Sequence, residues 1–273
     1  MTIEFLPTDS VYQEPSNGSN DGYARLYWMN GEPRLQTPGR FWTFPERMDE
    51  ASIQLESPWK SIEHTFSDGA QKTLLASPAL HLAPICWRQQ NFLKDASGNV
   101  DSWLPAGKRG KFAPGEGVYF EMLTFVEGST EAMVFSAKGT KTAMAWLASI
   151  LPDYRKMRDG VRQIRGGKPV PPWWFWLAIR GALDAQKKPV YEKTLGNNYV
   201  TPPTWVHDDL SSRDTWKAMY VGNELAARGE LLYQEAALWA SSPISDSHQA
   251  VQQETPSGRN TPRPLEDDSE IPF

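Results

Sequence analysis

A run of four aromatic residues, Trp173-Trp174-Phe175-Trp176, stands in the basic middle of this chain. Unstacked nucleic-acid bases bind to flat aromatic rings and their phosphates bind to cations, so rings interleaved with Lys and Arg are typical of single-strand binding. In a strand over 173–181, side chains alternate between the two faces, so Trp174, Trp176 and Arg180 share one face. We expect this face to meet solvent and stack bases. The alternative is that all four rings are buried.

Clustered cations flank the aromatic run. Residues 107–111 are typical of a glycine-rich basic loop, and residues 155–168 of a basic linker behind a helix. Because long charged side chains are rarely buried, we expect these cations to meet phosphates. A nearby strand, 117–126, adds Tyr119, although alternation alone leaves open which of its faces points inward. The predicted nucleic-acid-binding residues are Lys108, Arg109, Lys111, Tyr119, Lys138, Lys141, Arg155, Lys156, Arg158, Arg162, Arg165, Lys168, Trp174, Trp176 and Arg180.

Charge is segregated along the 273 residues, although the formal net charge is -5. Between residues 138 and 193, twelve Lys and Arg face four acids, and twelve minus four gives +8. Between residues 243 and 273, six acids face two arginines, and two minus six gives -4. A basic middle and an acidic end allow one molecule to hold a polyanion and a basic protein separately.

The last eight residues, Glu266-Asp267-Asp268-Ser269-Glu270-Ile271-Pro272-Phe273, place three apolar residues directly behind acidic ones. So few apolar residues cannot offset the entropy of ordering a polar segment, so we expect 243–273 to be a disordered tether. A partner pocket lined by Lys or Arg would accommodate the Phe273 ring, its carboxylate and the acids before it.

This ending resembles the C-terminal tip of bacterial single-stranded DNA-binding proteins, an acidic run closed by Ile-Pro-Phe. In that family the tip recruits helicases, nucleases, primases and recombination mediators to coated single strands. The resemblance covers about eight residues, and Ser269 interrupts the acidic run that the family usually shows. It implies a protein-docking role for Glu266, Asp267, Asp268, Glu270, Ile271, Pro272 and Phe273.

Catalytic and metal-binding signals are weak. The four histidines are scattered, and Cys86 is the one cysteine, so neither a zinc site nor an internal disulfide is expected. Cys86 lies between Ile85 and Trp87 and is expected to be a packed thiol. We therefore predict no enzyme, no cofactor and no metal. The apolar stretches are too short to cross a bilayer and no secretory signal is evident, so we expect the cytoplasm of a bacterial cell or phage-infected host and no membrane partner.

The element order predicts a mainly β fold with added helices (α+β). Strands are expected over 25–29, 41–44, 85–94, 117–126, 131–136, 173–181 and 190–195, with a helix from Thr140 to Leu151 that Pro152 ends, and a long helix or helical pair over 211–242. Two strands, a helix and two more strands suggest a decorated oligonucleotide/oligosaccharide-binding (OB-fold-like) barrel. The predicted organisation is a flexible arm over 1–22, a binding domain with a helical extension over 23–242, and the tether.

These patterns predict a protein that binds and protects single-stranded DNA with little sequence specificity and recruits replication, recombination and repair proteins through its tip. A homo-oligomer is compatible with this interpretation. One alternative is a strand-annealing recombination protein, which would also need a basic groove. Another is a carbohydrate-binding module, because tryptophan-rich strands also stack on sugars.

Overall fold

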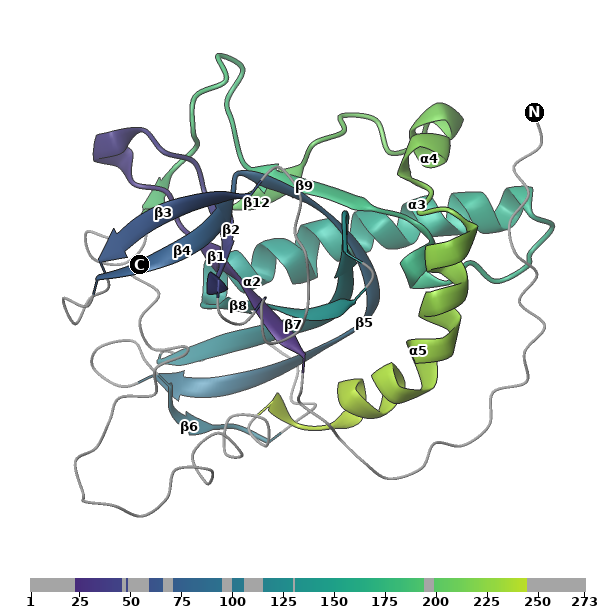
Figure 1. Ribbon diagram of the computed structural model, residues 1–273, viewed down its shortest axis with the longest axis horizontal. Helices are drawn as coiled ribbons and strands as arrows, with labels where there is room; N and C mark the ends of the chain where they lie inside the picture. The colour runs from purple at the N-terminus through teal and green to yellow at the C-terminus, as the bar shows by residue number, and fades with distance from the viewer. Residues whose placement is uncertain are drawn as a thin grey trace.

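One curled mixed β-sheet forms the body of the protein in the computed structural model (Figure 1). The structure describes residues 23–45, 48, 59–65, 71–94, 100–105, 115–129, 131–193 and 199–244. Helices pack on both faces of the sheet, so its central strands are buried on either side. The prediction of a mainly β fold with added helices is confirmed.

The main sheet has the strand order β12-β9-β5-β7-β8-β1-β2-β4-β3, with β6 paired to β5. Its strands are β1 (Ala24–Met29), β2 (Arg40–Thr43), β3 (Lys60–Thr65), β4 (Gln71–Ser77), β5 (Ala79–Lys94), β6 (Val100–Trp103), β7 (Glu116–Val126), β8 (Ala132–Lys138), β9 (Leu177–Gly181) and β12 (Pro203–Trp205). The pair β1–β8 is parallel and the other pairs are antiparallel. A separate short pair joins β10 (Glu192–Lys193) to β11 (Tyr199–Val200). In the described part of the chain, the path ends at β12 and β3 and does not close on itself.

The hairpin of β7 and β8 is the centre of the sheet, and its prediction is confirmed. Gly128 adopts a φ of 86° in the turn, a conformation that glycine reaches without steric cost. Alternation directs Phe120 toward the helix after β8, where its ring stacks on Trp146 at 5.9 Å between centroids. Tyr119 points to the opposite face and is fully buried beside Phe92 and Ile244. The prediction that Tyr119 contacts bases is therefore wrong for this conformation.

Strand β5 is long and bent, and it connects the two halves of the sheet. It spans 16 residues, pairs with β9 through its first part and with β6 through its last part, and lies against β7 along most of its length. Its register with β7 shifts between Pro84 and Cys86, a bulge of the kind that bends a strand. The sequence pattern predicted only its second half.

A buried ion network ties β1, β5 and β7 together. The Glu121 carboxylate is fully buried and accepts from Arg25 at 2.7 Å and from Arg88 at 2.9 and 2.7 Å. Arg88 also donates to the carbonyls of Trp239 and Ser242, at 3.0 and 3.2 Å. The network thus holds the end of the last helix against the sheet.

The helix after β8 does not stop at Pro152, so that prediction is wrong. It runs through α2 (Thr140–Ala145), a π-helical turn (Trp146–Ile150) and α3 (Leu151–Ile164). Proline lacks the N–H for a helical bond and its ring crowds the preceding turn. The wider π turn directly before Pro152 relieves this conflict, because its hydrogen bonds span one residue more. Residues 155–164, predicted as part of a basic linker, are therefore helical.

The aromatic run is not a continuous strand. A short 3-10 helix (Pro172–Trp174) precedes β9, and Trp173, Trp174 and Phe175 are all buried. The Trp173 indole donates to the Ala226 carbonyl at 2.9 Å, and its ring lies so close to Gly229 that a β-carbon there would stand 2.2 Å from it. The prediction that Trp174 faces solvent is wrong, because the last helix and its neighbours cover this segment.

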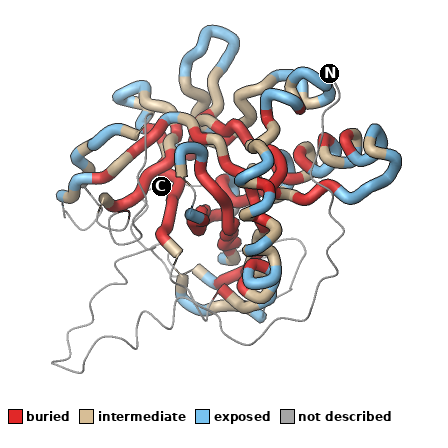
Figure 2. Tube along the Cα trace, turned by 45° about the vertical axis from the view of Figure 1, so that its right-hand side comes forward, coloured by how far each residue is buried: buried red, intermediate tan, exposed pale blue. Residues whose placement is uncertain are grey.

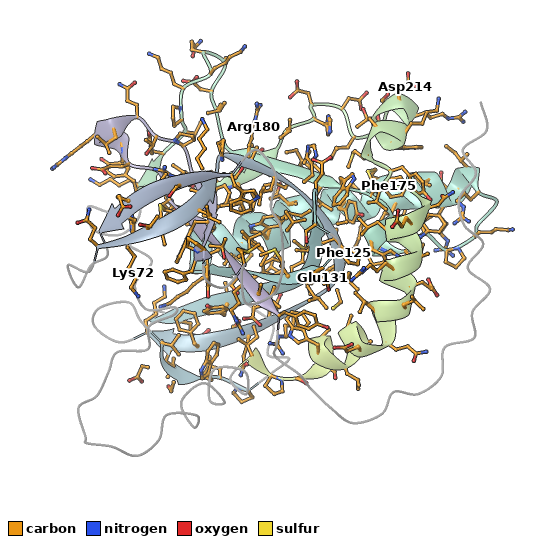
Figure 3. The ribbon with its side chains drawn as sticks, viewed as in Figure 1. Lys72, Phe125, Glu131, Phe175, Arg180 and Asp214 are labelled. Carbon is orange, nitrogen blue, oxygen red and sulfur yellow. The ribbon has the colours of Figure 1, made fainter. Side chains whose placement is uncertain are left out.

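Two helices complete the described chain. They are α4 (Arg213–Met219) and α5 (Asn223–Ser241), separated at Gly222, which has a φ of 89°. The predicted helical pair is confirmed. Figure 3 places Phe175 among the side chains beside α5, well apart from Arg180 on β9.

Candidate nucleic-acid interface

The outer side of α3 carries the main group of exposed cations among the residues that sequence analysis selected. Its inner side buries Leu151, Tyr154, Met157 and Val161 against the core. The opposite side and the following loop expose Arg155, Lys156, Arg162 and Lys168. Figure 2 shows exposed residues along this helix and the loop behind it. We call these four residues the α3 cations.

Acidic side chains are few on this surface. Over residues 151–171, six Lys and Arg face Asp153 and Asp159, and six minus two gives +4. Asp153 forms an ion pair with Lys156 at 3.2 Å, and both side chains are exposed, so water and salt weaken this pair. The surface therefore keeps a positive potential that suits a polyanion.

Three arginines of this segment lie over aromatic rings. The distances from guanidinium carbon to ring centroid are 5.7 Å for Arg155 and Trp87, 5.9 Å for Arg158 and Tyr154, and 4.5 Å for Arg165 and Trp174. Each distance is within the range in which the electron-rich ring face attracts a cation. The rings thus fix positive charge along α3 without neutralising it.

The loop after α3 is held by the arginines of the helix. Gly166 and Gly167 have φ values of 68° and 87°, and the Gly167 N–H donates to the Arg162 carbonyl, as in a glycine helix end. Arg158 donates to the Val170 carbonyl, Arg162 to the Gly167 carbonyl and Arg165 to the Pro169 carbonyl. These bonds give the loop a defined shape beside the helix.

Two of these arginines are less available to phosphates than predicted. Arg158 and Arg165 are half-buried, and burial lowers the pKa of each guanidinium from its ordinary value. The expectation that both are fully exposed is wrong, because each fills the space between α3 and the returning loop. We assign them mainly to holding the loop.

Four other predicted residues lie away from the α3 cations or are engaged. Lys138 is 4% exposed, on the opposite face of the sheet, with its ammonium 5.9 Å from the centre of the Phe92 ring. Lys141 bonds to the Glu192 carboxylate at 3.1 Å and the Lys193 carbonyl at 2.9 Å. Trp176 and Arg180 are half-buried. The sequence could not show these placements because they depend on which strands pair.

The remaining predicted residues lie outside the described residues. They are Lys108, Arg109 and Lys111 of the basic loop, and Glu266, Asp267, Asp268, Glu270, Ile271, Pro272 and Phe273 of the tip. Their roles remain predictions.

Sequence analysis undervalued Trp87. This ring is half-buried on β5, beneath Arg155, whereas the preceding and following residues serve other contacts. Arg88 on the opposite face belongs to the buried ion network. The alternation Trp87, Arg88, Gln89 was visible in the sequence, but which face carried α3 was not.

The described residues offer little for catalysis. The Cys86 thiol donates to the Ala236 carbonyl at 3.1 Å, and burial raises its pKa to about 12, so it is a poor nucleophile at neutral pH. Within the described ranges, no group of three or more His, Cys, Asp and Glu is placed to hold a metal ion. None of the helices in those ranges is both long and apolar enough to span a membrane.

Comparison with protein-family models, with curated proteins and with solved structures finds no match. The residues and their geometry must therefore carry the functional argument.

Proposed function

We propose that this protein binds single-stranded DNA with little sequence preference through the outer side of α3 and the loop that follows it. The observation that carries the proposal is the row of α3 cations, Arg155, Lys156, Arg162 and Lys168, exposed on one helix and its loop. Phosphate neutralisation supplies most of the non-specific affinity for nucleic acid. A rigid helix presents these charges at fixed spacing, which lowers the entropy lost on binding.

The preference for single strands follows from the rings beside the cations. Trp87 is half-buried next to Arg155, so part of an indole face lies beside a phosphate-binding group. Unpaired bases can stack on such a face, whereas the bases of a duplex are already stacked on each other. Stacking and phosphate contacts do not distinguish base edges, so sequence preference is weak.

We further propose that the acidic end, Glu266–Phe273, docks replication, recombination or repair proteins, as its resemblance to the bacterial family implies. This segment and the α3 cations carry opposite charge, which supports separate sites for protein and DNA.

A decorated OB-fold-like barrel was the expected scaffold. The strand path from β12 to β3 supports a broader curled sheet. The function proposed does not depend on barrel closure, because the α3 cations lie on a helix packed against the sheet.

The two alternative functions differ in what they require. A strand-annealing protein would use the same cations, and electron microscopy of rings or filaments with DNA would reveal it. A carbohydrate-binding module needs an exposed flat platform, and Trp173, Trp174 and Phe175 are buried instead. Sugars also need no cations, so the charge on α3 favours nucleic acid.

The test is the dissociation constant of the full chain for an oligo-dT of about thirty-five nucleotides, the matching duplex and a soluble polysaccharide, measured by anisotropy across a salt series. We expect the single strand to bind most tightly, with a log–log salt slope of about -3 from four cations at about 0.7 each. Equal or tighter binding of duplex, or binding that salt does not weaken, would contradict the proposal.

A further inference from the structure

We propose that the bases of the bound strand lie along one face of β5, on Trp87, Gln89 and Leu93, while Arg155 holds an adjacent phosphate. This inference rests on the proposed function and names the surface that reads the unpaired bases. We call Trp87, Gln89 and Leu93 the β5 strip.

The strip lies on the face of the sheet that carries α3. Side chains of a strand alternate, and Arg88 points to the face covered by α5, where it donates to Glu121 and to the Trp239 carbonyl. Trp87 therefore points the other way, and its contact with Arg155 of α3 confirms this. Leu93 follows six residues later and lies opposite Phe92, which packs with Tyr119 on the α5 face. At about 3.3 Å per residue, the strip is about 20 Å long.

The strip is accessible in the folded protein. Trp87 and Gln89 are half-buried, and Leu93 is 37% exposed. Leu93 is one of few large apolar side chains among the described residues with this much exposure. By contrast, Trp174 beneath Arg165 is 1% exposed and cannot stack on a ligand without unfolding its surroundings. Of the two tryptophans beneath arginines of α3 and its loop, Trp87 is thus the one that a base can reach.

The three side chains suit a base without selecting its identity. The Trp87 indole offers a π face to any base, the Gln89 amide both donates and accepts hydrogen bonds, and Leu93 offers apolar contact. Arg155 is exposed, so its side chain can move from the ring to a phosphate and free the indole face. Cation and ring then act on the same nucleotide.

The first experiment compares full-length Trp87→Leu and Trp87→Phe with the wild type for oligo-dT affinity, with thermal unfolding as a folding check. Leucine keeps apolar packing but removes the indole, so we expect about 5- to 100-fold weaker binding, the range for one lost stacking contact. Phenylalanine keeps a ring and should stay within about threefold of wild type. The salt slope should not change, because neither substitution removes a charge.

Trp103→Leu is the matched control. Trp103 is also half-buried, on β6 next to the strip, but its ring packs against Phe92 and Tyr119 on the α5 face. We expect its affinity to stay near that of the wild type. If Trp87→Leu binds as well as Trp103→Leu while wild-type binding is salt-dependent and specific for single strands, the β5 strip is wrong but the proposed function stands. If the wild type does not bind oligo-dT, the proposed function itself fails.

A second measurement needs no variant. Oligo-dT containing 5-bromodeoxyuridine, cross-linked to the wild-type chain by light and digested, should attach to the peptide that contains Trp87. Attachment confined to peptides of the α5 face, such as that containing Trp103, would overturn the proposal.

Discussion

Replacing Lys156, Arg162 and Lys168 together by glutamine will weaken binding of oligo-dT about 100-fold at 0.1 M salt, because three phosphate contacts are lost at about 0.7 released ions each. The log–log salt slope should become shallower by about 2 for the same reason. All three side chains are exposed, so the free energy of unfolding should change little. Anisotropy titrations at four or more salt concentrations measure both quantities.

A control variant removes the same number of charges elsewhere. Lys60 on β3 and Lys187 and Lys188 after β9 are exposed and lie outside the α3 segment. Their replacement by glutamine changes the net charge equally, so any general charge effect appears in both variants. If the two triple variants lose affinity equally, the strand is attracted by overall charge and α3 is not its binding surface.

Replacing Glu121 by glutamine will have the largest effect on stability. The carboxylate is fully buried between Arg25 and Arg88, so losing its charge leaves two guanidinium groups without their buried counter-ion. Breaking a buried ion pair in this way typically costs about 3–5 kcal/mol. Urea unfolding of the full chain should show a lower midpoint with an unchanged slope.

The comparison variant is Asp153→Asn, which removes the exposed ion pair with Lys156. An exposed pair contributes about 0–1 kcal/mol, so this change should have little effect on unfolding. A Glu121 variant no less stable than the Asp153 variant would show that the buried network does not hold β1, β5 and α5 together.

Local signals in the sequence predicted the elements that depend on neighbouring residues. The β7–β8 hairpin has alternating apolar residues and a glycine turn, and the break between α4 and α5 falls at a glycine with positive φ. Strands β3 and β4 were missed because Lys60–Thr65 is mostly polar, so its alternation carries little apolar signal. Their position is set by pairing within the sheet, which no local pattern shows.

The candidate site was predictable in composition but not in geometry. The basic window correctly drew attention to residues 155–168, yet Lys138 belongs to the opposite face and Lys141 is held by Glu192. The aromatic run attracted the stacking prediction because alternation was assumed across 173–181. In the fold, prolines and a 3-10 helix precede β9, and burial under α5 overrides the strand pattern. Trp87 was the better candidate, but only its contact with Arg155 distinguishes it.

The central claim is that a single strand lies on α3 and its loop. Hydrogen–deuterium exchange of the full chain, with and without saturating oligo-dT, tests it most directly. We predict slower exchange in peptides covering residues 151–171 when DNA is bound, with β1 and β2 unchanged. Unchanged exchange over 151–171, with protection on the α5 face instead, would contradict the account.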